Sequence, residues 1–526
     1  MSELIDNLPN NQIAVVGTGN LSLNLEGICR THGLETQFFV DEFREGTYLG
    51  KPIHNAGSLT QFYIESVSIF LIAISNDEFQ TAAKKRLINH GVPSSKIMII
   101  GDDPGLQILN LLFEKFDKVA VKALLSNKFS TLNEIEKFFL KNHWQSCIKN
   151  LSPNKKNIVL GYYGRGGGFR RHIYPLIQSL SPDFNIVSLS DESLDKKYEA
   201  PNHLYMSTFS ACNQHWIDLA ITAHVFPCAP RNIPRVTFSH IIYDFNLSDD
   251  YHAARIGEPS THYLFASSKP CFEWYKNLID QYELKNKLCI IPGGYLQLDQ
   301  NIEIAKAYKG AVKDILYAPT LALADYPHKE LASNLSYGLE IIKQLIESFP
   351  DKNIIFRPHP SDIRLLKLGR HGKDTMLLGK LIDFCYQHPS CIVDENTSDY
   401  MQSYNKSALL ITDTSSTAFT YAFTTNRPVV FFSPNENDLN KNLPREMKFI
   451  KDRTEVGYIA KSIGELTDII SMIFSNHHNQ KSTSSFKNET IYNIGSAEKY
   501  FKDNINYILS NKKHPDWHYV NWKSGN

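Results

Sequence analysis

The chain has 526 residues, which is too long for one ordinary hydrophobic core and suggests about three to four domains. Lysine plus arginine and aspartate plus glutamate each number 55, so the formal net charge is zero and no overall field attracts nucleic acid or an anionic membrane. Hydrophobic residues make up 42% and aromatic residues 12% of the chain, which excludes a disordered protein.

The first 105 residues show the strand and helix alternation of a small Rossmann-like domain. The first strand runs into a turn with Gly17 and Gly19, and the second strand ends at Asp41, as in dinucleotide-binding units. Ser22 stands where the third glycine would be, so a plain strand-to-helix turn stays an alternative. We expect strands at 12–16, 37–40, 68–74 and 96–100, and a helix at 80–91. The stretch resembles the N-terminal domain of sialic-acid-type O-acyltransferases, a resemblance that includes no catalytic residue.

A helical pattern at 106–152 predicts a connector, and a second α/β unit follows at 153–300. Its first strand leads into a glycine-rich loop, and glycines there let backbone N–H groups approach a ligand. We predict a ligand-binding or acceptor-binding loop, with a flexible lid carrying solvated arginines as the alternative. Its residues are Gly164, Gly166, Gly167 and Arg170.

A third unit at 301–475 again alternates strands with helices, and a tail at 476–526 contains a helix that we expect to cross back onto the second unit. The fold class is therefore α/β: a smaller Rossmann-like N-terminal domain precedes a pair of Rossmann-like domains. We expect a deep cleft between the two domains of the pair.

A first polar cluster follows the strand pattern at 354–356. Arg357 can grip a phosphate through two parallel hydrogen bonds, and His359 can donate a hydrogen bond or a proton. Two prolines stiffen this loop. An ion pair of Arg357 with Asp362, with His359 as a plain turn residue, is the structural alternative.

A second polar cluster, 412–416, separates the strand pattern at 409–411 from an apolar helical segment. Hydroxyl groups at a helix start cap it, and its free N–H groups attract anions. Because ligands bind beyond the carboxyl ends of parallel strands, we predict that both clusters share one phosphate-binding edge. Simple capping of the helix stays the alternative.

His240 stands at the end of another predicted strand, in the preceding half of the cleft. An imidazole with a pKa near the working pH suits a general base for a hydroxyl group. A purely structural role is the alternative for a lone histidine.

Five motifs follow one another in order: Ser239-His240, Gly293-Gly294 to Asp299, Tyr317-Ala318-Pro319-Thr320, Arg357-Pro358-His359-Pro360 and Thr412-Asp413-Thr414-Ser415-Ser416. Their order, over residues 155–475, resembles the CDP-glycerol glycerophosphotransferase family, the enzymes of teichoic-acid and related capsule synthesis. The resemblance implies a GT-B-type pair of facing Rossmann-like domains, with the nucleotide held mostly by the second.

The resemblance also implies the site. His240 matches the family's base, and His359 and Arg357 join it as catalytic residues that stabilise the departing nucleotide. The implied donor-binding residues are Gly293, Gly294, Tyr317, Pro319, Thr320, Asp413, Thr414, Ser415 and Ser416.

Two departures from the family leave the donor open. His240 is followed by Ile241-Ile242-Tyr243 where the family has a glycine, a proline and a lysine, and Gly294–Asp299 lacks the family's proline and arginine. A CMP-Kdo-type or other nucleotide-sugar transferase, a UDP-sugar epimerase and a non-catalytic nucleotide-binding scaffold are the alternatives.

The expected partners are a nucleotide-activated donor and a glycan acceptor, with no nucleic acid, no metal and no cofactor. The eight cysteines show neither a Cys-x-x-Cys pair nor zinc spacing, so we expect reduced thiols. No secretory signal pattern and no apolar run of about 18 residues occurs, which predicts a cytoplasmic protein. Attachment to the inner face of the cell membrane stays open.

Overall fold

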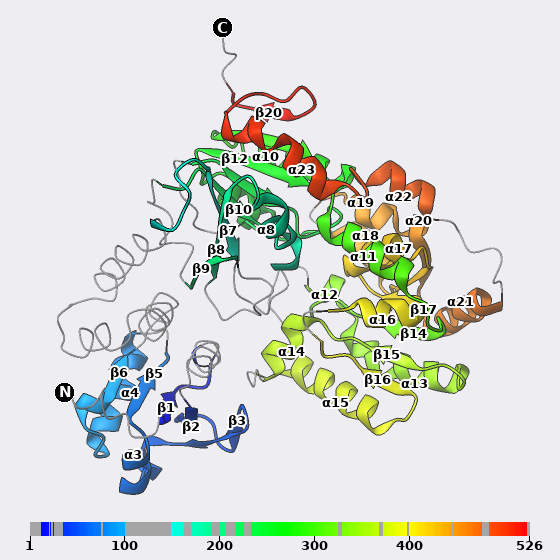
Figure 1. Cartoon of the computed structure of the whole chain (residues 1–526). Coiled ribbons are helices and arrows are strands. Elements are labelled where there is room, and N and C mark those ends of the chain that lie inside the picture. The colour runs from blue at the N-terminus through cyan, green and yellow to red at the C-terminus, as the bar shows by residue number, and fades with distance from the viewer. Residues whose placement is uncertain are drawn as a thin grey trace. The chain divides into compact units, whose positions relative to one another are not determined.

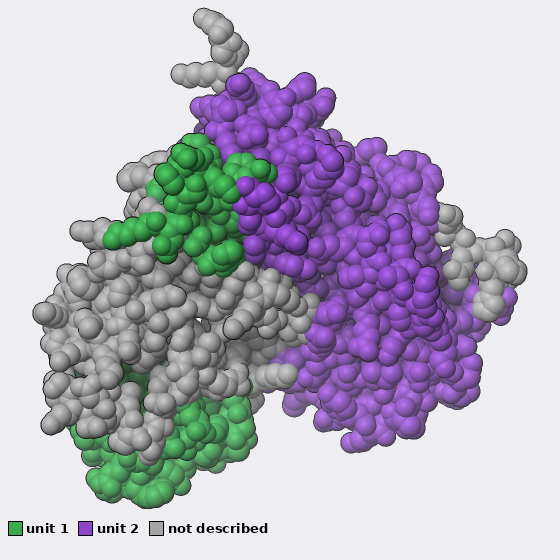
Figure 2. Space-filling model, in the orientation of Figure 1, with its two compact units in different colours: residues 1–164, 183–217 green, residues 165–182, 218–526 purple. Residues whose placement is uncertain are grey.

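The computed structural model describes the chain in segments and divides it into two compact units. Unit 1 comprises residues 1–164 and 183–217, and unit 2 comprises 165–182 and 218–526 (Figure 2). The described residues are 12–19, 22, 25, 35–74, 77–99, 149–162, 170–190, 200–205, 216–225, 233–323, 329–367, 372–396, 399–443, 445–475 and 483–522. The predicted connector lies almost wholly outside them, and the predicted domain boundaries stay predictions.

The N-terminal part of unit 1 is a six-stranded sheet with the order β3-β4-β2-β1-β5-β6. Neighbouring strands are parallel except for the antiparallel pair β3 and β4 (Figure 1). The central strands are apolar and buried, as a parallel sheet covered on both faces requires. The elements are β1 (Gln12–Val16), β2 (Glu35–Val40), β3 (Thr47–Tyr48), β4 (Lys51–His54), α3 (Gln61–Ser66), β5 (Ile69–Ile72), α4 (Asp77–Asn89) and β6 (Ile97–Ile99).

The turn after β1 needs its first glycine. Gly17 has a φ of +102°, and a Cβ there would lie 3.0 Å from the carbonyl oxygen of Ala73. The Asp41 carboxylate after β2 accepts the Thr18 hydroxyl at 2.7 Å and the backbone N–H of Phe43 at 2.9 Å. The Asp41 carboxylate therefore stabilises the loops that follow β1 and β2.

Unit 1 also contains three parallel strands from the start of the second α/β region. They are β7 (Asn157–Tyr162), β8 (Asn185–Ser190) and β9 (Asn202–Tyr205), in the order β7-β8-β9. The buried residues Ile158, Leu160 and Val187 provide their apolar packing.

Unit 2 contains two lobes. The first lobe is built on β10 (Leu219–Thr222), β11 (Arg235–Phe238), β12 (Thr261–Ala266) and β13 (Lys287–Pro292), which pair in parallel in that order. The C-terminal strand β20 (His518–Val520) joins β13 antiparallel. The helices of this lobe are α8 (Pro175–Leu180), α9 (Asp249–Ile256), α10 (Lys269–Gln281) and α23 (Ala497–Leu509), and the 3-10 helix η4 covers Arg170–His172. Two further helices, α11 (Leu296–Ala307) and α22 (Ser484–Thr490), pack against α17 (Thr417–Thr425) of the second lobe.

The second lobe is a six-stranded, fully parallel sheet with the order β16-β15-β14-β17-β18-β19 (Figure 1). The strands are β14 (Asp314–Tyr317), β15 (Ile354–Phe356), β16 (Cys391–Val393), β17 (Ser407–Thr412), β18 (Val429–Phe432) and β19 (Gly457–Ala460). The helices are α12 (Lys329–Ala332), α13 (Gly338–Ser348), α14 (Pro360–Lys367), α15 (Lys373–Gln387), α16 (Met401–Lys406), α17 (Thr417–Thr425), α18 (Glu436–Asn442), α19 (Lys448–Lys451), α20 (Arg453–Val456) and α21 (Ile463–Ser475). The predicted α/β class with several Rossmann-like parallel sheets is confirmed.

Among the residues that the structure describes, no helix is long and apolar enough to cross a membrane. The described cysteines, Cys271, Cys289, Cys385 and Cys391, are free thiols, and three of them are buried. The tail returns to the first lobe, where Phe501 on α23 packs edge-on against Phe238 with ring centroids 4.9 Å apart.

Candidate functional site

Three polar loops meet at the carboxyl edge of the second lobe, because β14 lies between β15 and β17. The Arg357 backbone N–H donates to the carbonyl oxygen of Tyr317 at 2.9 Å. Asp413 Oδ1 accepts the backbone N–H of Thr320 at 2.8 Å, and the Thr412 hydroxyl donates to the Ala318 carbonyl at 2.6 Å. The structure therefore places the clusters at 317–320, 357–362 and 412–416 side by side.

The Arg357 guanidinium is buried and held from one side by an acidic loop. Its Nη1 atom forms a 2.6 Å ion pair with Asp394, and its Nη2 atom donates to the Asn396 carbonyl at 2.6 Å. The structural alternative of an ion pair with Asp362 is wrong, because that carboxylate accepts the backbone N–H groups of Ala322 and Leu323. A guanidinium fixed in this way has little rotational freedom left to lose when it binds an anion.

His359 has a defined proton position. Its Nδ1 atom accepts the backbone N–H of Ser361 at 3.1 Å, so the neutral ring carries its hydrogen on Nε2. Burial, and to a lesser degree the charge of Arg357, lowers the pKa of His359 to about 4. The ring is therefore neutral near pH 7 and offers one N–H donor.

The residues of 413–416 have different roles in the structure. Both Asp413 and Thr414 bind protein groups: the carboxylate also accepts the Asn334 N–H at 3.2 Å, and the Thr414 hydroxyl donates to the Ala332 carbonyl at 2.9 Å. Burial raises the pKa of Asp413 to about 6, although its backbone hydrogen bonds oppose this rise. Asp413 and Thr414 thus shape the loop through these contacts, and their binding of a donor stays a prediction.

Ser415 and Ser416 stand at the start of α17. The Ser415 hydroxyl accepts the Thr417 N–H at 3.4 Å, whereas the N-cap residue Ser416 makes no capping hydrogen bond with its side chain. Simple capping, the alternative for this cluster, therefore does not account for the Ser416 side chain. Binding of donor phosphate by these two serines stays a prediction.

Three other residues that we predicted to bind the donor, Tyr317, Gly293 and Gly294, make contacts within the protein. Tyr317 is 2% exposed and stacks on Phe356 with ring centroids 5.6 Å apart. The N–H groups of Gly293 and Gly294 both donate to the Ala266 carbonyl at 3.0 Å. Binding of a donor by these three residues stays a prediction. Pro319 is buried beside Thr320, whose N–H is bound to Asp413.

The two glycines are there because other groups approach closely. A Cβ on Gly293 would lie 2.4 Å from the Phe265 ring, and Gly294 has a φ of +106°. A Cβ on Gly294 would lie 2.6 Å from the Tyr492 carbonyl oxygen. Close packing of β13 against β12 and the C-terminal segment explains both glycines.

His240 follows β11 in the first lobe and lies in a cluster of histidines. Its ring is edge-on to His224 with centroids 4.5 Å apart, and its carbonyl accepts the Tyr295 hydroxyl at 3.0 Å. Burial, followed by the neighbouring His252, lowers the pKa of His240 to about 3. His224, His240 and His252 line one small cavity of about 10 Å³, the room that one water molecule needs.

His224 was not recognised from the sequence, although a signal exists. β10 and β11 are parallel neighbours with Thr222 opposite Thr237. His224 comes two residues after β10 ends, and His240 comes two residues after β11 ends. Equal spacing after paired strands places the two rings together.

A row of side chains links the two lobes. The His172 ring lies 5.4 Å from Tyr295, and burial, Arg171 and His240 all lower its pKa. The Arg171 guanidinium lies 4.7 Å from the centre of the Tyr400 ring, and the Arg357 guanidinium lies 5.8 Å from the same centre. The site therefore has a continuous line from His240 through Arg171 to Arg357.

The predicted glycine loop is described only at its end. Gly164, Gly166 and Gly167 lie outside the described residues, and Arg170 is buried at the start of η4. The next two residues, Arg171 and His172, belong to the row of side chains that links the two lobes. In the part of the chain that the structure describes, no group of three or more His, Cys, Asp or Glu could hold a metal ion.

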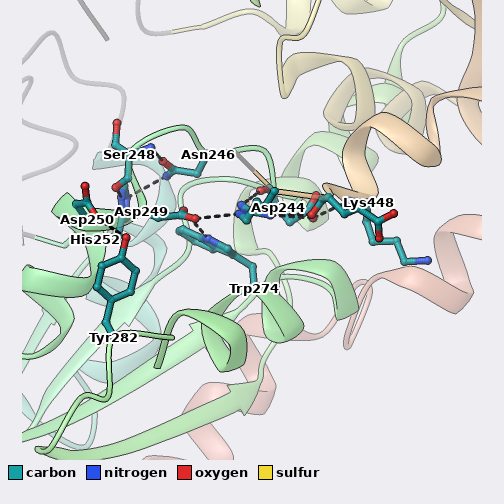
Figure 3. Close-up of polar contacts among 11 residues, drawn as sticks. Asp244, Asn246, Ser248, Asp249, Asp250, His252, Trp274, Tyr282 and Lys448 are labelled. Carbon is teal, nitrogen blue, oxygen red and sulfur yellow. Dashed lines mark hydrogen bonds and ion pairs between the residues drawn. The ribbon is translucent and has the colours of Figure 1, made fainter. Parts of the chain in front are cut away.

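The segment that follows His240 extends a polar network between the lobes (Figure 3). Asp244 accepts the backbone N–H of Lys448 at 2.7 Å. Asn246 donates to Nε2 of His252 at 3.1 Å, and Nδ1 of His252 donates to the Ser248 carbonyl at 2.9 Å. The neutral tautomer of His252 is thereby fixed.

Comparison with known proteins gives a family match and several distant structural likenesses. Residues 297–495 match the model of the family described as CDP-glycerol:poly(glycerophosphate) glycerophosphotransferase. No curated protein matches the chain.

Among solved structures, a variant of the wall teichoic acid polymerase TagF is 16% identical, covers 72% of this chain and 98% of its own, and has a TM-score of 0.47. A UDP-GlcNAc 2-epimerase from Methanocaldococcus jannaschii is 13% identical over 68% of this chain and 99% of its own, with a TM-score of 0.41. A glycosyltransferase from Rickettsia africae is 14% identical, covers 68% of this chain and 98% of its own, and has a TM-score of 0.40. All three TM-scores are below 0.5, so the structural likeness is loose.

Proposed function

Residues 297–495 carry a domain of the CDP-glycerol:poly(glycerophosphate) glycerophosphotransferase family, and on this premise we propose that the chain transfers glycerol phosphate from CDP-glycerol to a hydroxyl group of a cell-surface polymer. The reaction takes place in the cytoplasm, with the growing polymer presented at the inner face of the cell membrane. It uses a nucleotide-activated donor and a glycan or polyol acceptor.

One observation supports this proposal more than any other. Arg171 from the first lobe and Arg357 from the second lobe lie against the same ring, that of Tyr400. Two guanidinium groups beside one ring can both donate hydrogen bonds to one bound anion, and the ion pair with Asp394 holds the Arg357 guanidinium in position. The diphosphate of a nucleotide donor is an anion of suitable size and charge.

The histidines supply the proton chemistry on either side of this anion site. His240 takes the proton of the acceptor hydroxyl, and the acceptor oxygen attacks the phosphorus of the glycerol phosphate group. The bond from that phosphorus to the oxygen of CMP breaks. Arg357, the Nε2–H of His359 and the start of α17 stabilise the negative charge that develops on CMP.

The low pKa of His240 becomes consistent with its role as a base once the donor is bound. In the empty site, burial and His252 hold that pKa at about 3, which makes the imidazole a weak base. An anionic diphosphate nearby favours the imidazolium and raises the pKa toward the working pH. Binding of the donor thus activates the base.

The test is a donor panel with the purified full chain. CDP-glycerol, a CMP-sugar and UDP-sugars are incubated with and without a glycerol phosphate polymer, and the released nucleotide is measured by chromatography. We expect acceptor-dependent CMP release from CDP-glycerol, which persists in EDTA. Release from the CMP-sugar alone would mean a sugar transferase, conversion of a UDP-sugar without acceptor would mean an epimerase, and binding without turnover would mean a scaffold.

A further inference from the structure

The segment directly after His240 crosses from the first lobe to the second and is anchored there by a buried carboxylate. Asp244 is 4% exposed. Its Oδ2 atom accepts the Lys448 N–H at 2.7 Å, and its Oδ1 atom accepts the Phe449 N–H at 2.8 Å (Figure 3). The carboxylate thus satisfies two N–H groups in the first turn of α19, which belongs to the second lobe.

Tyr243 makes a second anchor beside the first. Its ring stacks on Phe419 with centroids 4.1 Å apart and an angle of 21° between the planes. Its hydroxyl donates to the Asp452 carboxylate, also in the second lobe. Phe419 lies on α17, three residues after Ser416, so Tyr243 ties the His240 segment to the helix whose start we assign to the donor phosphate.

Arg445 extends the anchor back into the first lobe. Its Nη2 atom donates to the Asp244 carbonyl at 2.7 Å, and its Nε atom donates to Asp249 Oδ2 at 3.0 Å. The other oxygen of Asp249 accepts the Trp274 indole N–H at 3.0 Å. Trp274 and His252 line the same small cavity as His240, so the network reaches the surroundings of the His240 ring.

We propose that Tyr243 and Asp244 are positioning residues that fix His240 relative to the start of α17 and hence to the donor phosphate. The proposal depends on the proposed function for its activity readout. A base must lie within about 2.6–3.2 Å of the proton it takes, and a displacement of about 1 Å can cost roughly 10²-fold in rate. Only three residues separate His240 from Asp244, so an anchor at Asp244 leaves His240 little freedom.

The distinctive feature of this chain lies in the same segment. After His240 the chain has Ile241-Ile242-Tyr243, where the CDP-glycerol glycerophosphotransferase family usually has a glycine, a proline and a lysine. Ile242 and Tyr243 are both buried in a core cluster shared with Phe419 and Phe449 of the second lobe. Ile242 and Tyr243 therefore make apolar and aromatic contacts with the second lobe within three residues of His240.

The test compares Asp244→Asn and Tyr243→Phe with Asp250→Asn as a matched control. Asp250 lies in the first turn of α9, and its carboxylate accepts the Tyr282 hydroxyl at the exposed surface (Figure 3). We expect Asp244→Asn to lower kcat about 10- to 100-fold, with the KM for donor changed less than about 3-fold, because Arg357 and His359 stay in place. Tyr243→Phe should lower kcat about 3- to 10-fold. Asp250→Asn should match the wild type.

A second readout needs no turnover. Titration of histidine ring signals by NMR should show the His240 pKa rising toward 6.5 in Asp244→Asn and staying at its wild-type value in Asp250→Asn. A wild-type kcat for both test variants, or an unchanged His240 titration, would overturn the inference. If the wild type turns over no donor, the proposed function fails while the titration still decides this inference, and if Asp244→Asn does not fold, Tyr243→Phe decides it.

Discussion

The Nδ1 atom of His359 accepts the backbone N–H of Ser361 at 3.1 Å, and this one hydrogen bond places the ring proton on Nε2. The bond uses the loop's own backbone, so it forms before any ligand is present. His388 makes a comparable bond, its Nδ1 accepting the Ser390 N–H at 3.3 Å, but it lies at the end of α15. The chain thus contains the histidine to which we assign a role in the proposed reaction and a matched control.

The first prediction uses this pair. His359→Ala removes the Nε2–H donor that we propose binds the leaving phosphate, so kcat should fall about 10²- to 10³-fold. His388→Ala should keep at least half of the wild-type kcat. Steady-state CMP release measures both, and equal losses in the two variants would contradict the role given to His359.

The second prediction concerns the pH dependence of the reaction. Burial lowers the pKa values of His240 and His359 to about 3 and about 4, below the ordinary histidine value. Both rings of the free enzyme are therefore neutral down to about pH 5, whereas ordinary histidines would already be largely protonated there. We expect kcat/KM for the donor to stay level between about pH 5 and pH 8, and an acid limb with a pKa of 6 to 7 would contradict the burial of these rings.

The third prediction separates packing from ligand binding at Gly293. A Cβ there would lie 2.4 Å from the Phe265 ring, so Gly293→Ala should destabilise the protein by about 1–3 kcal/mol. Gly379 lies within α15, where a Cβ meets nothing within 4 Å, so Gly379→Ala should be neutral or stabilising by about 0.5–1 kcal/mol. Urea unfolding of the two variants gives the comparison.

Donor affinity decides the role of the same glycine. If Gly293 only packs, the folded Gly293→Ala variant should bind CDP with an affinity within about 3-fold of the wild type. A selective loss of CDP binding at unchanged stability would instead restore Gly293 to the donor site.

The fourth prediction concerns Asp413, which accepts the backbone N–H groups of Thr320 and Asn334 with its two oxygens. An asparagine offers one acceptor oxygen, so Asp413→Asn leaves one N–H without its partner and costs about 1–3 kcal/mol at pH 5. Asp383→Asn, at an exposed position of α15, should cost less than about 0.5 kcal/mol.

The pH dependence of this cost has a defined sign. Burial raises the pKa of Asp413 to about 6, above its unfolded value, so its stabilising contribution is full below about pH 3.9 and is lost as the pH rises through about 6. Asparagine does not titrate. The difference in unfolding free energy between wild type and Asp413→Asn should therefore shrink from pH 5 to pH 8, and a difference that grows would contradict the raised pKa.

Much of the fold could be predicted because parallel strands buried on both faces are short apolar runs. The runs at 12–16, 235–238 and 354–356 coincide with β1, β11 and β15. The edge at which Arg357 and Thr412–Ser416 meet could also be predicted, since both follow such runs.

The partners of individual side chains could not be predicted in the same way. Asp394, which pairs with Arg357, lies 37 positions later in the sequence. Asp244 accepts the N–H groups of Lys448 and Phe449, which lie more than 200 positions later. Such contacts depend on how the elements pack, and no local pattern encodes them. The close packing of Gly293 and Gly294 against Phe265 and Tyr492 could not be predicted either, because those partners come from other elements.

The central claim is that His240 acts as the base in an acceptor-dependent transfer from CDP-glycerol. The most direct measurement is the rate of CMP formation from CDP-glycerol, with and without a glycerol phosphate polymer, for the wild type and for His240→Gln. We predict CMP formation that requires the polymer and falls about 10²- to 10⁴-fold in His240→Gln, while CDP still binds. No CMP formation by the folded wild type, or an unchanged rate in His240→Gln, would contradict the account.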